Sequence, residues 1–407
     1  MTDKADRAII GETTSLIAEA GIRGATLRKI GARAGTNFAR LTTNHGGKDQ
    51  LLATCFADVV ERDLKQLATI VEEFARAEVT SPAPFLWALC EDAGGRRQTD
   101  YLVLTELLLA STRPELNDIF RQWLLRRHKI LRSMAVACDI DPVALDVLGL
   151  ILLMECGFAV SNYRSVTYRV LAGSGLKEAF ALLSGRPFVA DQAELAQHSA
   201  NYFIDYGAAS PAKRANGNGG TAEGRDRIVA AAAAIIQEEG IDKLTNRAIA
   251  KRAGVSLALT TYHFPSINEL VVAGLRRVAE VLAASLDPDV TRDQIRAAML
   301  ADRRNPAGAA EDFVRVHRGW LQISLMAARS PKEERLGYLM RRQVGLLAYA
   351  GVDEDKRGTS VTRTAAASYA LWSGGAYLVA RAFPADDQPF DFGAQAQLAA
   401  RRLLGIG

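Results

Sequence analysis

Residues 245–266 read TNRAIAKRAGVSLALTTYHFPS, and this stretch decides the fold expected for the chain. Thr245 is suited to cap a helix that runs to about Arg252, because a threonine side chain accepts a hydrogen bond at a helix N-terminus. Gly254 then lies at a sharp turn, and Ser256 caps the next short helix. Two short helices joined in this way have the geometry that places the second helix in the major groove of DNA.

The same signals occur twice in the chain. The segment from Ala8 to Leu52 aligns without a gap with the segment from Arg227 to Val271. Matching residues in this register are Ile9 and Ile228, Ile17 and Ile236, Glu19 and Glu238, Gly21 and Gly240, Thr26 and Thr245, Arg28 and Arg247, Arg33 and Arg252, Gly35 and Gly254, and Leu51 and Leu270. We therefore predict that a unit of roughly 200 residues is duplicated in tandem.

Composition and periodicity predict an all-α fold. Apolar residues return every three or four positions, and few runs alternate with the period of a strand. Helices are expected, for example, over Val143–Tyr163 and Glu334–Tyr349. The predicted organisation is a helix-turn-helix domain at 1–52, a helical regulatory domain at 53–206, a linker at 207–224, a second helix-turn-helix domain at 225–271 and a second regulatory domain at 272–407.

Several classes of protein are not expected. The first residues do not resemble a signal peptide, and Val147–Val160, interrupted by Glu155, is short for a membrane span and predicts a buried core helix. The four cysteines show no close pairing, which favours reduced thiols in a cytoplasm. The sequence carries no nucleophile–base pattern, metal-ligand spacing or phosphate-cradling glycine loop, so neither an enzyme nor a cofactor is expected.

Positive charge is concentrated in the two helix-turn-helix segments. Residues 22–48 hold six basic residues and no acid, and residues 243–267 hold four basic residues and no acid. The whole chain has a net charge of only +4, so the remainder is mildly acidic. Clustered cations are the electrostatic footprint of a protein that contacts DNA phosphates.

These motifs resemble the TetR/AcrR family of bacterial regulators. The resemblance is carried by Ile249–Ser256, Tyr262–Ser266 and Glu269-Leu270, and in more divergent form by Ile30–Gly35 and Lys48–Leu52. It implies a small DNA-binding domain, a larger helical ligand-sensing domain and function as a dimer. The partners expected are therefore a double-stranded DNA operator and a small-molecule effector.

The resemblance also assigns roles to individual residues. The recognition helices would be Asn37–Asn44 and Ser256–His263, and a fourth helix would begin at Gly47 or Ser266, where Ser266 and Glu269 form a capping box. The residues expected at base edges are Arg40, Thr42, Thr43, Asn44, Thr260, Thr261 and Tyr262. Those expected near phosphate are Thr26, Arg28, Thr245 and Arg247, with Lys48 at the start of the fourth helix.

In a dimer of the family, two helices of each subunit form a four-helix bundle. This single chain contains four helices that could form the equivalent bundle without a second subunit. Val143–Ser161 and Leu176–Leu183 would meet Thr364–Ala382 and Ala394–Leu404. The small residues Gly157, Gly374 and Gly375 would allow close helix contact. We predict a monomer that acts as a pseudo-dimer and binds an imperfect palindrome, with a true homodimer as the alternative.

Aromatic residues in the regulatory domains suggest a ligand pocket in each half. They are Trp87, Tyr101, Trp123 and Tyr163 in the first half, and Trp320, Tyr338, Trp372 and Tyr377 in the second. A competing hypothesis is a protein-interaction or ligand-sequestering module with decayed DNA-binding heads. It is motivated by Thr42, Thr261, Ile267 and Gly46, where the chain departs from the family pattern.

Overall fold

The chain is helical throughout the part that the computed structural model describes, which comprises residues 2–186, 188, 219–284, 297, 309–384 and 386–406. The helices of the first half are α1 Thr2–Gly24, α2 Leu27–Arg33, α3 Phe38–His45, α4 Lys48–Arg76, α5 Ala83–Gly94, α6 Gln98–Leu109, α7 Pro114–Arg132, α8 Ala135–Cys138, α9 Pro142–Asn162 and α10 Val166–Leu183. Those of the second half are α12 Gly219–Glu238, η1 Ile241–Lys243, α13 Asn246–Ala253, α14 Leu257–His263, α15 Ile267–Ala284, α17 Ala309–Arg329, η2 Pro331–Glu333, α18 Glu334–Gln343, α19 Leu346–Ala350, α20 Arg363–Ala380 and α21 Phe392–Leu404.

The linker predicted at 207–224 is too long at its C-terminal end, because α12 already begins at Gly219. Tertiary contacts explain the early start. A Cβ atom on Gly224 would lie 3.3 Å from the side chain of Leu259, and the guanidinium of Arg225 stands 5.2 Å from the ring centre of Phe264. Gly224 and Arg225 of α12 thus lie against α14 and the residue that follows it, which offsets the low helix propensity of glycine at position 224. Residues 207–218 lie outside the described part.

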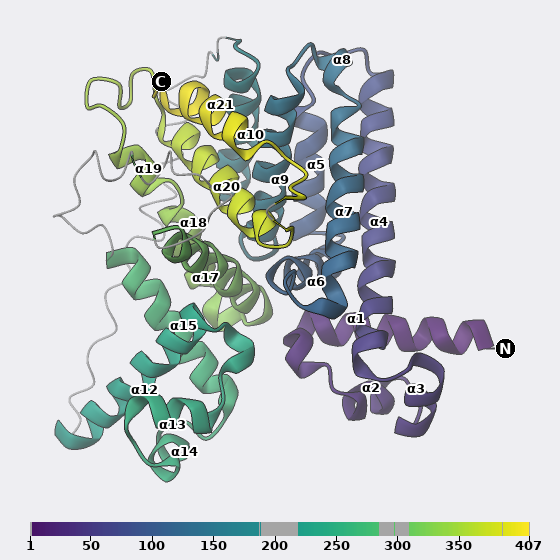
Figure 1. Cartoon of the computed structure of the whole chain (residues 1–407), viewed down its shortest axis with the longest axis vertical. Helices are drawn as coiled ribbons and strands as arrows, with labels where there is room; N and C mark the ends of the chain where they lie inside the picture. The colour runs from purple at the N-terminus through teal and green to yellow at the C-terminus, as the bar shows by residue number, and fades with distance from the viewer. Residues whose placement is uncertain are drawn as a thin grey trace.

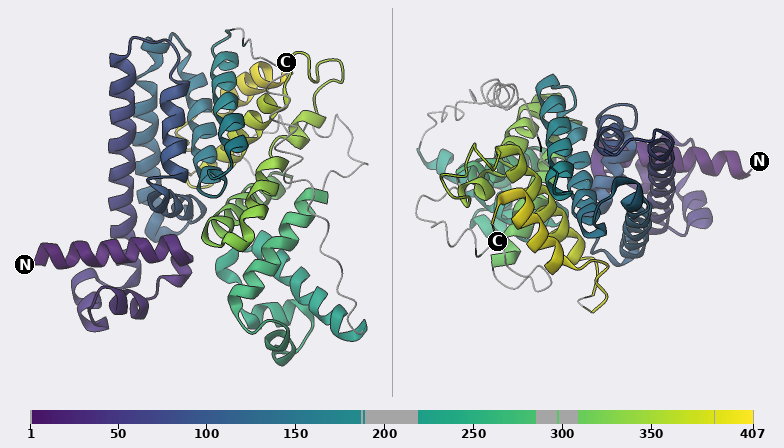
Figure 2. Two further views of the ribbon diagram at one scale, coloured as in Figure 1. Left: turned by 180° about the vertical axis from the view of Figure 1, so that it is seen from behind. Right: turned by 90° about the horizontal axis from the view of Figure 1, so that it is seen from above.

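Two three-helix units, which we call the first head (α1–α3) and the second head (α12–α14), lie at the same end of the molecule. Figure 1 shows α3 and α14 at the lower tip, with α10 and α21 at the opposite end, and the view from behind in Figure 2 agrees. Helices α4 and α15 leave the two heads and run into the remaining helical body, so the domain boundaries predicted at 52 and 271 fall inside continuous helices.

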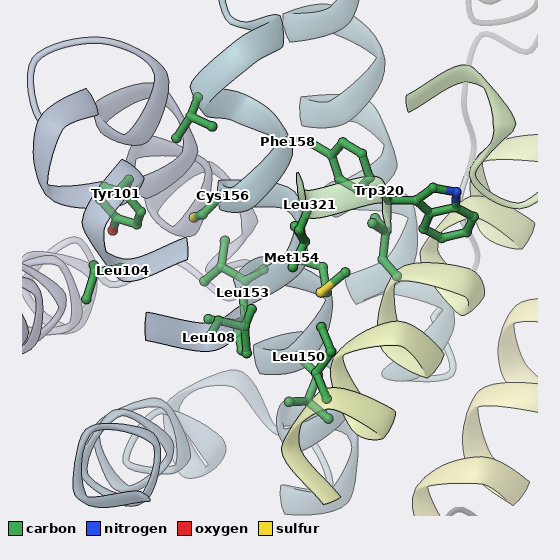
Figure 3. Packing of buried hydrophobic residues seen from close by; sticks show 14 of the residues in the cluster. Tyr101, Leu104, Leu108, Leu150, Leu153, Met154, Cys156, Phe158, Trp320 and Leu321 are labelled. Carbon is green, nitrogen blue, oxygen red and sulfur yellow. The ribbon is translucent and has the colours of Figure 1, made fainter. Parts of the chain in front are cut away.

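Helix α9 is the centre of that body. It is the one helix among the described residues that is long and apolar enough to cross a membrane, yet 89% of its most apolar window is buried inside the protein. An apolar helix without a polar face must be surrounded by other elements. Figure 3 shows how Met154 and Phe158 of α9 lie beside Trp320 and Leu321 of α17, from the other half of the chain.

Helices α9 and α10 pack against α20 and α21. Glycines permit this close approach. A Cβ atom on Gly375 of α20 would lie 3.2 Å from both the Cβ and the carbonyl oxygen of Leu150 on α9, and one on Gly157 would lie 2.6 Å from Leu321. Gly374 instead leaves room for the ring of His317 within the second half.

Polar contacts across the two halves are buried as well. Glu155 of α9 accepts hydrogen bonds from Arg341 of α18 at 2.9 and 3.1 Å, and also from the hydroxyl of Tyr168 at 2.7 Å. The hydroxyls of Ser161 and Ser324 lie 2.7 Å apart, on α9 and α17. Each such group is costly to bury unless its partner is in place, so these bonds fix the register of the two halves.

Replacing Gly375 with leucine should therefore destabilise the protein. The added side chain would meet the backbone of α9, which cannot move aside, and we expect the free energy of unfolding to fall by about 1–3 kcal/mol or more. Urea denaturation measures the change. The matched control is Gly11→Ala on the exposed face of α1, where a Cβ has open space and should stabilise the helix by roughly 0.5–1 kcal/mol. Equal effects of the two substitutions would contradict the close approach.

A buried carboxyl group makes the same interface sensitive to pH. Glu178 of α10 accepts a hydrogen bond of 2.8 Å from Thr362, the residue that caps α20, and burial raises the pKa of Glu178 from 4.5 to about 7. Because the folded protein holds this proton more tightly than the unfolded chain does, the stabilisation is complete below about pH 4.5 and is lost as the pH rises through 7.

Glu178→Gln should remove this pH dependence. A neutral amide carries no desolvation penalty of charge, so the variant should be more stable than the parent protein at pH 8, by at most about 3 kcal/mol. Denaturant unfolding at intervals between pH 5 and 8 measures both profiles. A variant whose stability falls with pH as steeply as that of the parent would contradict the assignment.

Candidate nucleic-acid interface

The second and third helices of each head are built by equivalent local bonds. Gly35 and Gly254 occupy the turn with left-handed φ values of 61° and 64°, a conformation that favours glycine. The turn then closes with a backbone hydrogen bond from Thr36 N to Gly31 O at 2.9 Å in the first head, and from Val255 N to Ala250 O at 3.0 Å in the second. The heads therefore share one helix-turn-helix geometry.

Four of the expected DNA-contacting residues are helix caps. Thr26 and Thr245 accept hydrogen bonds from Lys29 N at 3.4 Å and Ala248 N at 3.1 Å, and start α2 and α13. Asn37 and Ser256 do the same for α3 and α14, with distances of 2.9 and 3.1 Å. All four side chains are exposed, and a capping hydroxyl or amide still has a proton to donate outward.

The outer faces of α3 and α14 carry the remaining candidates. Exposed side chains there are Arg40, Thr42 and Thr43 on α3, and Thr261 and Tyr262 on α14, where Tyr262 is 75% exposed. His263 is half-buried, with its ring 5.2 Å from that of Tyr262. The side chain of Asn44 lies outside the part that the structure describes.

The prediction that Thr260 reads base edges is wrong. Its side chain is completely buried, and its hydroxyl donates to the carbonyl of Ser256 at 3.3 Å. The equivalent position in the first head is Leu41, which is also completely buried. This position faces the inside of the head in both copies, so neither residue can reach DNA.

Two of the basic residues counted in the head segments support the fold instead. Arg33 binds Glu19 at 2.7 Å and Arg252 binds Glu238 at 2.6 Å, which are equivalent pairs that tie α2 to α1 and α13 to α12. Lys48 also turns inward, and its ammonium donates to the carbonyl of Ile22 at 3.0 Å. Other basic side chains of these segments are exposed, among them Arg28, Lys29, Arg40, Lys243, Arg247 and Lys251.

The capping box expected at the start of α15 takes a different form. Ser266 accepts a hydrogen bond from Glu269 N at 3.2 Å, as an N-cap should. However, the Glu269 carboxylate accepts from the Ser266 hydroxyl at 3.1 Å, whereas in a capping box it would reach the backbone N–H of Ser266. In the first head, Gly47 precedes α4 without any side-chain cap.

The eight aromatic residues expected to line a pocket in each half make the following contacts within the described part of the chain. Tyr101 and Trp123 both donate to buried Asp63, at 2.9 and 2.7 Å. Three more pack against other aromatic rings: Trp87 against Tyr168, and Trp320 and Tyr377 against His317. The hydroxyl of Tyr338 donates a hydrogen bond to Glu334, and the indole N–H of Trp372 donates one to Gln395. Tyr163 borders a recess of about 40 Å³. These contacts place most of the aromatics in the packed interior, and their part in a ligand pocket stays a prediction.

Asp63 should be essential for stability. It also accepts a hydrogen bond of 2.6 Å from Arg127, and both charged side chains are almost completely buried. Asp63→Ala leaves that guanidinium without its carboxylate and should lower the free energy of unfolding by about 3–5 kcal/mol. Thermal or urea denaturation tests this, with exposed Asp49→Ala as the control for a change of charge alone. A loss no larger than that of the control would disprove the structural role.

A cleft of about 540 Å³ lies between the two heads. Its walls come from the ends of α1 and α6, from η1 and α15, and from α17, which runs past both heads. The sequence predicted no cavity at this place. The two halves of the chain contribute to it together, so neither half contains the signal alone.

Comparison with protein families supports this description of the second head. Residues 228–273 match the family model described as "Bacterial regulatory proteins, tetR family". No curated protein matches the chain. The match supports membership of the tetR family and, in general terms, a DNA-binding helix-turn-helix regulator of transcription. Among the described residues, no group of three or more histidine, cysteine, aspartate or glutamate side chains is placed to hold a metal ion.

Proposed function

We propose that this protein is a sequence-specific, ligand-responsive repressor of transcription in the cytoplasm, whose single chain presents two different heads to one operator. The observation that carries the proposal is that α3 and α14, each with an exposed outer face, lie at one end of the molecule (Figure 1). A duplex that contacts both heads needs this arrangement, because a two-headed reader must address successive turns of one DNA face.

The pseudo-dimer is supported by the contacts of α9 and α10 with α20 and α21. These four helices come from equivalent places in the two halves, and in the family that the chain resembles such a bundle joins two subunits. Within one chain the bundle would replace dimerisation. The two regulatory parts then serve to hold two heads at a fixed separation.

The operator should be an imperfect palindrome. Equivalent positions on the two recognition helices carry different side chains, such as Arg40 opposite Leu259 and Thr43 opposite Tyr262. An arginine at a base edge favours guanine, whereas tyrosine and leucine make other contacts. The two half-sites should therefore differ in sequence and lie about one helical turn, roughly 34 Å, apart.

Selection from random duplex DNA by the purified protein tests this function. We expect enrichment of one motif with two unlike half-sites. Arg40→Ala should relax selection in one half-site and Tyr262→Ala in the other, each at a cost of about 1–3 kcal/mol. Failure to enrich any motif at moderate salt would overturn the proposal.

Phosphate contacts have a separate signature. Arg28→Ala and Arg247→Ala should weaken binding to all sequences alike and reduce the salt dependence of affinity by about one unit each. Arg33→Ala is the matched control, since its exposed guanidinium is already paired with the carboxylates of Glu19 and Glu12. Its salt dependence should equal that of the parent protein.

A second candidate function is a protein-interaction or ligand-sequestering module with heads that no longer bind DNA. The observation in its favour is that α14 exposes two large apolar side chains, Leu257 at 47% and Tyr262 at 75%. This candidate requires that Arg28→Ala and Arg247→Ala leave the activity of the protein in cells unchanged. The repressor requires that both substitutions impair it.

A further inference from the structure

Helix α17 passes between the two heads and contacts a turn glycine of each. A Cβ atom on Gly21 would lie 3.4 Å from the guanidinium of Arg329, and one on Gly240 would lie 3.1 Å from that of Arg318. These glycines are equivalent in the two heads and have positive φ values of 71° and 91°. The cleft of about 540 Å³ opens between these two contacts.

The cleft is fixed at its edges by bonds between the halves. Arg329 of α17 binds Glu106 of α6 at 2.7 Å, and donates to the carbonyls of Ala18 and Ile17 in α1 at 2.7 and 3.0 Å. Arg23 of the first head donates to the carbonyl of Ile241 in the second head at 3.0 Å. The space is therefore a built feature of the junction between the heads.

Part of the wall is apolar. Ile22 and Ile241 occupy equivalent positions in the two heads and line the same cleft, together with Leu325 of α17 and Val272 of α15. The volume lies within the range of about 300–1,000 Å³ typical of small-molecule sites. Apolar walls of this kind suit the body of an organic ligand better than they suit water.

Gln322 of α17 supplies an independent sign of a ligand. Its side chain lines the cleft and is only 5% exposed, and its Oε1 atom has no hydrogen-bond partner. A buried acceptor without a donor costs about 1–3 kcal/mol. A ligand that brings an N–H or O–H group to this atom would recover that free energy.

The charges of the cleft select against a cation. Its basic side chains are Arg23, Lys29, Arg318 and Arg329. Its two carboxylates are both paired with arginine, Glu106 with Arg329 and Glu19 with Arg33. The excess of positive charge along the cleft therefore attracts an anionic group of a ligand.

We propose that the cleft between the heads binds a small amphipathic anion, with its apolar body against Ile22, Ile241 and Leu325 and a hydrogen-bond donor at Gln322. The regulatory meaning of the site rests on the proposed function. A ligand held between equivalent points of the two heads sets their separation, so its binding is linked to that of DNA. Binding to the cleft itself needs no DNA.

Titration of the full-length protein with 8-anilinonaphthalene-1-sulfonate tests the site without DNA, so a failure here is distinct from failure of the proposed function. This probe combines apolar rings, an N–H donor and a sulfonate. We expect one saturable site per chain. Gln322→Leu, which removes a buried unsatisfied acceptor and should not impair folding, should weaken binding by about tenfold.

Two further comparisons complete the experiment. Val272→Trp should narrow the cleft and weaken binding at this site, whereas Val136→Trp, at a position of α8 that is 93% exposed, is the matched control and should bind as the parent protein does. N-phenyl-1-naphthylamine lacks the sulfonate and should bind about tenfold more weakly. The proposal is overturned if Gln322→Leu and Val272→Trp bind the sulfonate probe like the parent protein, or if the uncharged probe binds equally well.

Discussion

A helix that is apolar on every side must be enclosed, and this requirement organises the whole protein. Helix α9 lies in the first half, but α17, α18, α20 and α21 of the second half cover much of its surface. The first half alone would expose those apolar side chains to water, at a cost of about 25 cal/mol for each Å². The buried contact of Glu155 with Arg341 fixes how α9 is aligned along α18. This interface and the contacts of Arg23 and Arg329 at the junction together place the two heads.

The two halves use the same local devices in different surroundings. Equivalent caps, turn glycines and Arg–Glu pairs build both heads, as in Arg33–Glu19 and Arg252–Glu238. The surroundings differ, because α17 of the second half lies between the heads and also contacts α9. The second half thus supplies α17 to the junction, whereas the first half supplies the end of α6.

The sequence predicts what depends on near neighbours, and it fails where distant residues decide. The caps at Thr245 and Ser256 follow from residue type and position. The sequence also contains a signal that Thr260 faces inward, because the aligned residue of the first head is the apolar Leu41. By contrast, the helix predicted over Glu334–Tyr349 breaks at Gly345, where a Cβ would lie 2.5 Å from the backbone of Ala367 on α20. No pattern along the chain predicts this close approach of two segments. Nor does one predict that Asp63 accepts hydrogen bonds from Tyr101 and Trp123, or that a cleft lies between the heads.

The proposed function requires that one chain hold both heads through its own α9–α20 interface, without a second subunit. The mass of the full-length protein in solution, measured by light scattering, tests this most directly. We predict a species of 44.0 kDa across the concentrations at which the protein binds DNA. A species of twice that mass would show that the heads are paired between chains, and would contradict the single-chain reader.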